Sequence, residues 1–131
     1  MSYYNNELEA HDDYPSGEWS GYFQQPDTGP QRHWMSFRME FRGGSIRGDG
    51  TDFVGPFSLA GKSDVATGRC FWTKQYVGKH QVTYQGLNQG QGIVGEWVIS
   101  GIWTGQFHIW PKGLGGLEEH YAHQEVMRQA W

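Results

Sequence analysis

The chain has 131 residues and a formal net charge of −4, which fits one domain with a real core and provides no positive field to attract nucleic acid. Aromatic residues make up 16% of the chain and there are 20 glycines, a composition typical of all-β proteins. No apolar run reaches the length of a membrane span, no apolar leader opens the chain, and the single cysteine, Cys70, has no internal disulfide partner. These features predict a soluble cytoplasmic protein that contacts neither membrane nor nucleic acid.

Residues 1–16 carry several acidic side chains without a sustained period, and they are predicted to form an acidic N-terminal arm. The clearest strand signal follows at 32–42, where apolar and polar residues alternate from Met35 to Phe41. Glycine, proline and asparagine mark turns between further runs of the same kind. The eight predicted strands are 17–24, 32–42, 45–50, 53–60, 68–76, 80–87, 93–100 and 102–110, with a turn beginning at Asp49-Gly50.

The C-terminal tail over 113–131 loses the two-residue period and gains helix-forming residues. Ala122, Val126 and Ala130 recur at helical spacing, which predicts a short helix that packs on the preceding domain, over 17–112, or on a partner.

A repeated motif links the two ends of the predicted β domain. Residues 17–23 and 101–107 both read Gly-x-Trp-[Ser/Thr]-Gly-x-Phe. Closure of an antiparallel sheet brings its first and last strands together and removes unpaired edges. Eight short, turn-linked strands therefore predict an all-β fold, an eight-stranded antiparallel up-and-down barrel closed by these two strands. A β-sandwich is the alternative, but its crossovers need longer connections.

The Gly-x-Trp motif ending at Trp19, the meandering strands and a basic residue after the last strand, Lys112, resemble the calycins: lipocalins, fatty-acid-binding proteins and avidins. In size the chain is similar to the eight-stranded avidin type. The resemblance covers about 17–112 and implies a barrel in which Trp19 packs across one end and Lys112 covers it. Biotin binding does not transfer, because Ser20-Gly21-Tyr22 replaces the polar residues that follow this tryptophan in avidins.

Polar and aromatic side chains are densest on the strands at 68–76 and 80–87, where a short turn brings similar faces side by side. Aromatic walls with a few placed polar groups are typical of small-ligand pockets. The alternative is that Lys74 and His80 face solvent while Phe71 fills the core, since alternation does not decide the phase. Tryptophans near the C-terminal end of the barrel either line its mouth or form packing pairs. The candidate ligand-binding residues are Trp72, Lys74, Tyr76, His80, Tyr84, Trp97 and Trp103.

These observations predict a non-enzymatic barrel that binds a small apolar or aromatic ligand, without catalytic residues, metal or cofactor. One alternative is a filled structural barrel that acts through homo-oligomerisation or protein interaction. Another is a small enzyme of isomerase, lyase or hydrolase type that uses Lys74, Tyr76 or His80. The pair His120 and His123 has the spacing of metal ligands but lacks further ligands nearby, so no zinc site is predicted.

Overall fold

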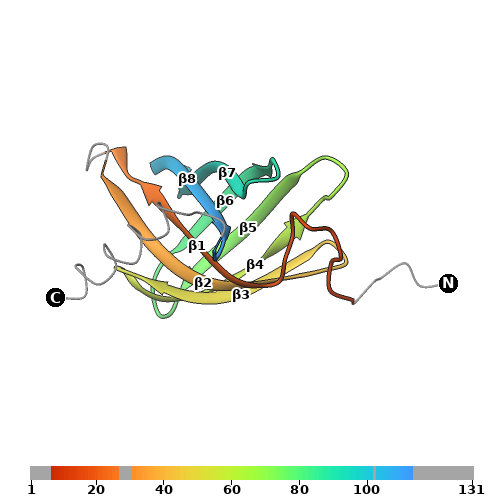
Figure 1. Ribbon diagram of the computed structural model, residues 1–131. Coiled ribbons are helices and arrows are strands. Elements are labelled where there is room, and N and C mark those ends of the chain that lie inside the picture. Colours follow the sequence, from red (N-terminus) through yellow and green to blue (C-terminus); the bar gives the residue numbers. More distant parts are fainter. Residues whose placement is uncertain (1–6, 27–30, 102, 114–131) are drawn as a thin grey trace.

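The computed structural model describes residues 7–26, 31–101 and 103–113, which form a closed barrel of eight antiparallel strands (Figure 1). Each strand pairs with the next along the chain, and the last pairs with the first. The strands are β1 (Gly17–Gln24), β2 (Arg32–Arg42), β3 (Ser45–Asp52), β4 (Gly55–Ser63), β5 (Arg69–Tyr76), β6 (Gln81–Asn88), β7 (Ile93–Ile99) and β8 (Trp103–Pro111). The predicted all-β, up-and-down barrel is confirmed, whereas the helix predicted in the tail lies outside the described residues.

The seam between β1 and β8 contains the two copies of the repeated motif, with Phe23 opposite Phe107. Gly21 is required there because a Cβ atom would lie 2.3 Å from the carbonyl oxygen of His108 on β8. Gly105 is in the same position relative to β1, since its Cβ would lie 2.1 Å from the carbonyl oxygen of Gln24. The repeat therefore serves closure: each copy supplies a glycine where a side chain would collide with the backbone of the other strand.

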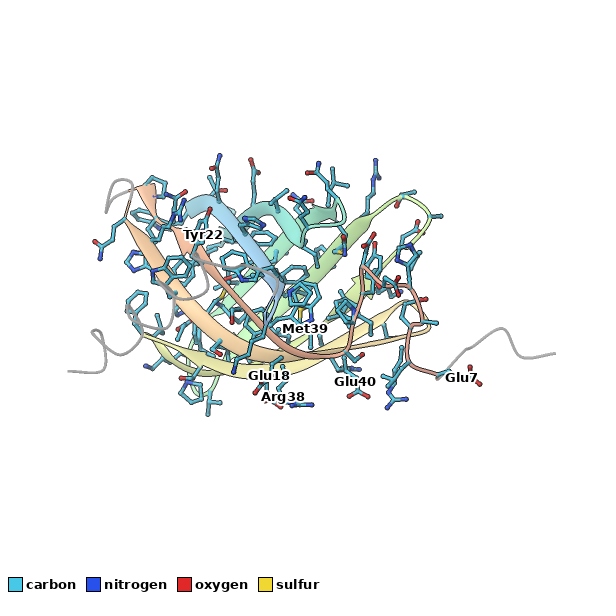
Figure 2. All side chains as sticks on the ribbon, viewed as in Figure 1. Glu7, Glu18, Tyr22, Arg38, Met39 and Glu40 are labelled. Atoms are coloured by element: carbon cyan, nitrogen blue, oxygen red, sulfur yellow. The ribbon has the colours of Figure 1, made fainter. Side chains whose placement is uncertain are left out.

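Alternation along each strand separates an inner from an outer face. In β2 the predicted apolar face, from Met35 to Phe41, is buried inside the barrel. Figure 2 shows Met39 directed into the barrel, while Glu18, Arg38 and Glu40 point away from it. Side chains of β2 thus alternate between the interior and the outer wall, and the apolar ones point inward, as expected for a barrel with a packed interior.

Several predicted strand boundaries are wrong, and β4, for example, runs from Gly55 to Ser63 rather than over 53–60. β3 continues to Asp52, and the turn to β4 is formed by Phe53 and Val54 rather than at Asp49-Gly50. The carboxylate of Asp52 explains this turn, because its Oδ1 accepts a hydrogen bond of 2.9 Å from the backbone N–H of Val54. β6 begins at Gln81, so His80 belongs to the turn after β5.

Aromatic rings fill the middle of the barrel. Trp72 on β5 and Tyr84 on β6 stack with ring centroids 5.3 Å apart and an interplanar angle of 8°. Phe107 on β8 meets both rings edge-on, at 5.3 and 5.0 Å. These contacts close the interior between its two ends, so each end has to be considered as a separate site.

The close packing of β1 against β8 predicts that a side chain at Gly21 lowers the stability of the protein. We expect Gly21→Val to lower the free energy of unfolding by about 3 kcal/mol, because the new side chain would collide with the backbone of β8. Gln106→Val, an exposed position on β8, should change it by less than about 0.5 kcal/mol. Urea denaturation followed by circular dichroism measures both. Equal stability of the two variants would contradict the role of Gly21 in closure.

Candidate functional site

The structure shows which of the two alternating faces of β5 points into the barrel, which the sequence left open. Lys74 is 1% exposed, whereas Phe71 is 49% exposed on the outer wall. The alternative interpretation, with Lys74 in solvent and Phe71 in the core, is therefore wrong. Trp72 on the same face lies opposite Gly61 of β4, where a Cβ atom would lie 2.6 Å from the Cβ atom of Trp72, so the missing side chain lets the two strands pair with Trp72 inside the barrel.

Lys74 is neutralised by an acidic residue that enters from the end of β3. Its Nζ lies 2.9 Å from Oδ2 of Asp52, and both side chains are buried. The hydroxyl of Tyr76 donates a second hydrogen bond to the same oxygen, at 2.6 Å. A buried ammonium is tolerated when it is paired and hydrogen-bonded in this way, so Asp52 is what allows Lys74 to lie inside.

Four aromatic rings surround the same ammonium group. The distances from Lys74 Nζ to the ring centroids lie between 4.8 and 5.1 Å. At this range the negative ring faces attract a cation, more strongly where water is excluded. The rings belong to Phe23, Phe57, Tyr76 and Tyr84. We call these four rings with Lys74 and Asp52 the lysine box.

The phenols of the lysine box are held in their neutral form. Burial raises the pKa of Tyr84, although the positive charge of Lys74 opposes the change. Burial also raises the pKa of Tyr76, and the nearby charge of Asp52 raises it further. The box therefore combines one cation, one anion and two neutral phenols, and its charges balance among its own members.

The space left beside the lysine box is small. A cavity of about 30 Å³ lies against Lys74, Tyr76, Tyr84 and Trp97. Small-molecule pockets have volumes of roughly 300–1,000 Å³. The predicted site residues thus pack against one another around a space much smaller than such a pocket.

The structure brings most predicted site residues together. His80 is exposed in the turn, as the alternative interpretation has it, but it lies at the rim of the cavity with its ring 5.0 Å from that of Tyr76. Trp103, the first residue of β8, is 56% exposed and does not line this cavity. The residues that do line the interior are Trp72, Lys74, Tyr76, Tyr84 and Trp97.

The most important residue that the sequence prediction missed is Asp52. It follows the predicted turn at Asp49-Gly50 and gives no separate signal in the sequence, although an inward lysine on a neighbouring hairpin requires a carboxylate within reach. Phe23 and Phe57 were not singled out either, because aromatic residues at regular strand positions look like ordinary core residues. The signal that could have found all three is the register of adjacent strands, once Lys74 is placed inside.

Comparisons with protein-family models, with curated proteins and with solved structures give no match for this chain. Among the described residues, no three histidine, cysteine or acidic side chains are grouped to hold a metal ion. His120 and His123 lie outside those residues. The described part of the chain also contains no helix long and apolar enough to cross a membrane.

The buried ion pair predicts an asymmetric response to mutation. Lys74→Met should lower the free energy of unfolding by about 3–5 kcal/mol, because it leaves the carboxylate of Asp52 buried without its cation. Lys112→Met is the matched control, since Lys112 pairs with Glu18 at 3.3 Å on the exposed surface and should cost less than about 1 kcal/mol. Adding Asp52→Asn to Lys74→Met should recover part of the loss. Chemical denaturation tests the series, and equal losses for Lys74→Met and Lys112→Met would contradict it.

The raised phenol pKa values predict alkaline instability. The ordinary pKa of Tyr76 and Tyr84 is 10.0, and in the folded protein both phenols keep their protons to higher pH. Their contribution to stability is therefore complete below pH 10 and is lost as the pH rises above it, because the unfolded chain releases these protons first. Thermal denaturation from pH 8 to 11 should show a falling melting temperature above about pH 9–10. Tyr76→Phe should flatten this fall, and a wild-type curve that stays flat to pH 11 would contradict the prediction.

Proposed function

We propose that the protein is a filled, non-enzymatic barrel that acts through contacts of its outer wall with a second copy of the chain. The observation that carries this proposal is the cavity of about 30 Å³ at the residues predicted to bind a ligand. Recognition by a barrel without a roomy interior takes place on its outside, and the outer wall offers a suitable surface.

A row of outward side chains crosses five neighbouring strands in direct register. From β6 to β2 the partners are Leu87, Val94, His108, Tyr22 and Trp34. Most members are apolar or aromatic; Leu87 is exposed, whereas Trp34 is buried. We call this the outer row. An open groove of about 410 Å³ follows it over β1, β7 and β8, with polar side chains beside Tyr22 and Val94. A mixed polar and apolar surface of this kind is typical of non-obligate protein interfaces.

A second copy fits the outer row better than a strongly charged partner. The net charge of −4 is small for 131 residues, so two copies repel each other weakly. A straight row of side chains can meet the same row on another copy across a two-fold axis, which is the commonest symmetry of soluble oligomers. The polar residues beside the groove, Gln24, Glu96 and Gln106, can supply hydrogen bonds at the rim of such an interface.

Kinship with the calycins is part of the same proposal. Its support is the closed eight-stranded barrel and the fully buried Trp19 on the first strand. Lys112, which the resemblance places over that tryptophan, is instead exposed and paired with Glu18. A barrel of this type without a roomy interior is consistent with a role in protein contacts rather than in carrying a ligand.

Light scattering tests the proposal directly. At high micromolar concentration we expect a mass near twice the chain mass of 15.0 kDa. Leu87→Lys should return it to the monomer mass, because a charge would be buried in the interface without a partner. Ala60→Lys adds the same charge to an exposed position on β4, away from the outer row, and should leave the dimer intact.

A titration with a fluorescent hydrophobic probe tests the interior in parallel. We expect no saturable change in tryptophan emission, because the predicted site has no room for the probe. A strictly monomeric protein, or saturable probe binding that Trp97→Leu abolishes, would overturn the proposal and favour the ligand-binding barrel.

A further inference from the structure

The end of the barrel opposite the lysine box is closed by a residue that belongs to no strand. Tyr14 belongs to the N-terminal arm, which lies at the end of the barrel where β2 turns into β3 and β4 is followed by β5 (Figure 1). It is only 2% exposed and belongs to the same buried cluster as Phe41, Ile46 and Cys70. A single arm side chain therefore completes an interior that the strands leave incomplete.

The ring of Tyr14 is held by aromatic contacts of defined geometry. It meets Phe41 of β2 edge-on, with centroids 5.5 Å apart and an interplanar angle of 80°. His11 packs against its other side at 5.5 Å and 84°. Trp19 contacts Phe41 from β1 at 5.6 Å. Phe41 and Trp19 of the strands thus form an aromatic socket, which is filled by Tyr14 of the arm and covered by His11.

The arm is fastened to the barrel by separate hydrogen bonds rather than by a continuous strand ladder. The N–H of Glu9 donates to the carbonyl of Phe41 at 2.8 Å. Nδ2 of Asn88 donates to the carbonyl of Asp13 at 2.6 Å. Segments with few ladder bonds open at lower free energy than the strands of a sheet. The arm can therefore leave the socket while the barrel remains folded.

We propose that this socket is a binding site for a neutral, phenol-sized aromatic compound, and that Tyr14 is its internal occupant. A ligand of this class would take the place of the tyrosine ring against Phe41 and release the arm. The site lies at the opposite end of the barrel from the lysine box, and it does not depend on self-association through the outer row.

The electrostatics of the socket disfavour an anionic ligand. Burial raises the pKa of Tyr14 to about 12, and the Cys70 thiol is the next largest cause. The carboxylates of Asp13, Asp64 and Glu9 raise this pKa further. Burial likewise raises the pKa of Cys70 to about 12. Both groups are therefore uncharged at neutral pH, and an anionic ligand would lose its hydration there and be repelled by the nearby carboxylates, whereas a neutral phenol avoids both costs.

Exchange can be detected in the wild-type chain with p-cresol, which reproduces the tyrosine side chain. Cleavage by a glutamate-specific protease after Glu9 reports release of the arm, and labelling of Cys70 by a thiol reagent reports opening of the socket. We expect p-cresol to raise the cleavage rate saturably, by roughly tenfold, while labelling of Cys70 does not increase. Unchanged cleavage, or a parallel rise of cleavage and labelling, would overturn the proposal, because the parallel rise indicates unfolding instead of exchange.

Emptying the socket gives an independent test. Tyr14→Ala should speed labelling of Cys70 by roughly tenfold or more, and p-cresol should restore protection and raise the melting temperature. Phe57→Ala, which opens the lysine box at the other end, is the control in which p-cresol should not alter labelling of Cys70. Failure of p-cresol to protect Tyr14→Ala, or equal protection of Phe57→Ala, would overturn the proposal. If Tyr14→Ala does not fold, the wild-type exchange experiment decides.

Discussion

The pairing of β1 with β8 is the constraint on which the other features of this molecule depend. It turns a meander of eight hairpin-connected strands into a closed wall without free edges. Closure also divides each strand into residues that must fit a shared interior and residues that must face outward. Gly21 and Gly105 permit it by letting the two backbones approach where any side chain would collide. The composition of the interior follows from this division.

A closed interior explains why the inward charged residue of β5, Lys74, carries its own counter-ion. Trp72 and Tyr76 must face inward to fill the barrel, and the two-residue period then places Lys74 inside with them. Water cannot solvate the ammonium there, so stability requires a carboxylate and a polarisable environment. Asp52 supplies the first from the end of β3, and the surrounding rings supply the second. The lysine box is thus a solution to a packing constraint, which accounts for its lack of free volume.

Much of the fold could be predicted from the sequence because its signals are local. The alternation around Met35 and Phe41 identifies β2, and the repeated Gly-x-Trp motif identifies the strands of the seam. The candidate site was harder, because alternation gives the period of a strand but not which face is inside. For β5 the two phases place either Phe71 or Lys74 in the core, and each phase puts a charged residue, Arg69 or Lys74, on the inner face. The decision depends on Asp52, which lies 22 residues away in the sequence and reaches Lys74 only through the register of three strands.

The two ends of the barrel are closed by different physical means, and the difference decides which end can exchange its occupant. At one end Lys74 belongs to a strand and is held by an ion pair, so removing it would expose a charge and break the sheet. At the other end Tyr14 is neutral and lies on an arm outside the sheet, so its removal breaks aromatic contacts and a few hydrogen bonds. A ligand that restores those contacts compensates for most of that loss, whereas no small molecule can replace Lys74 while its backbone stays in β5. If this fold binds a small molecule in its interior, physical chemistry therefore places that site at the arm.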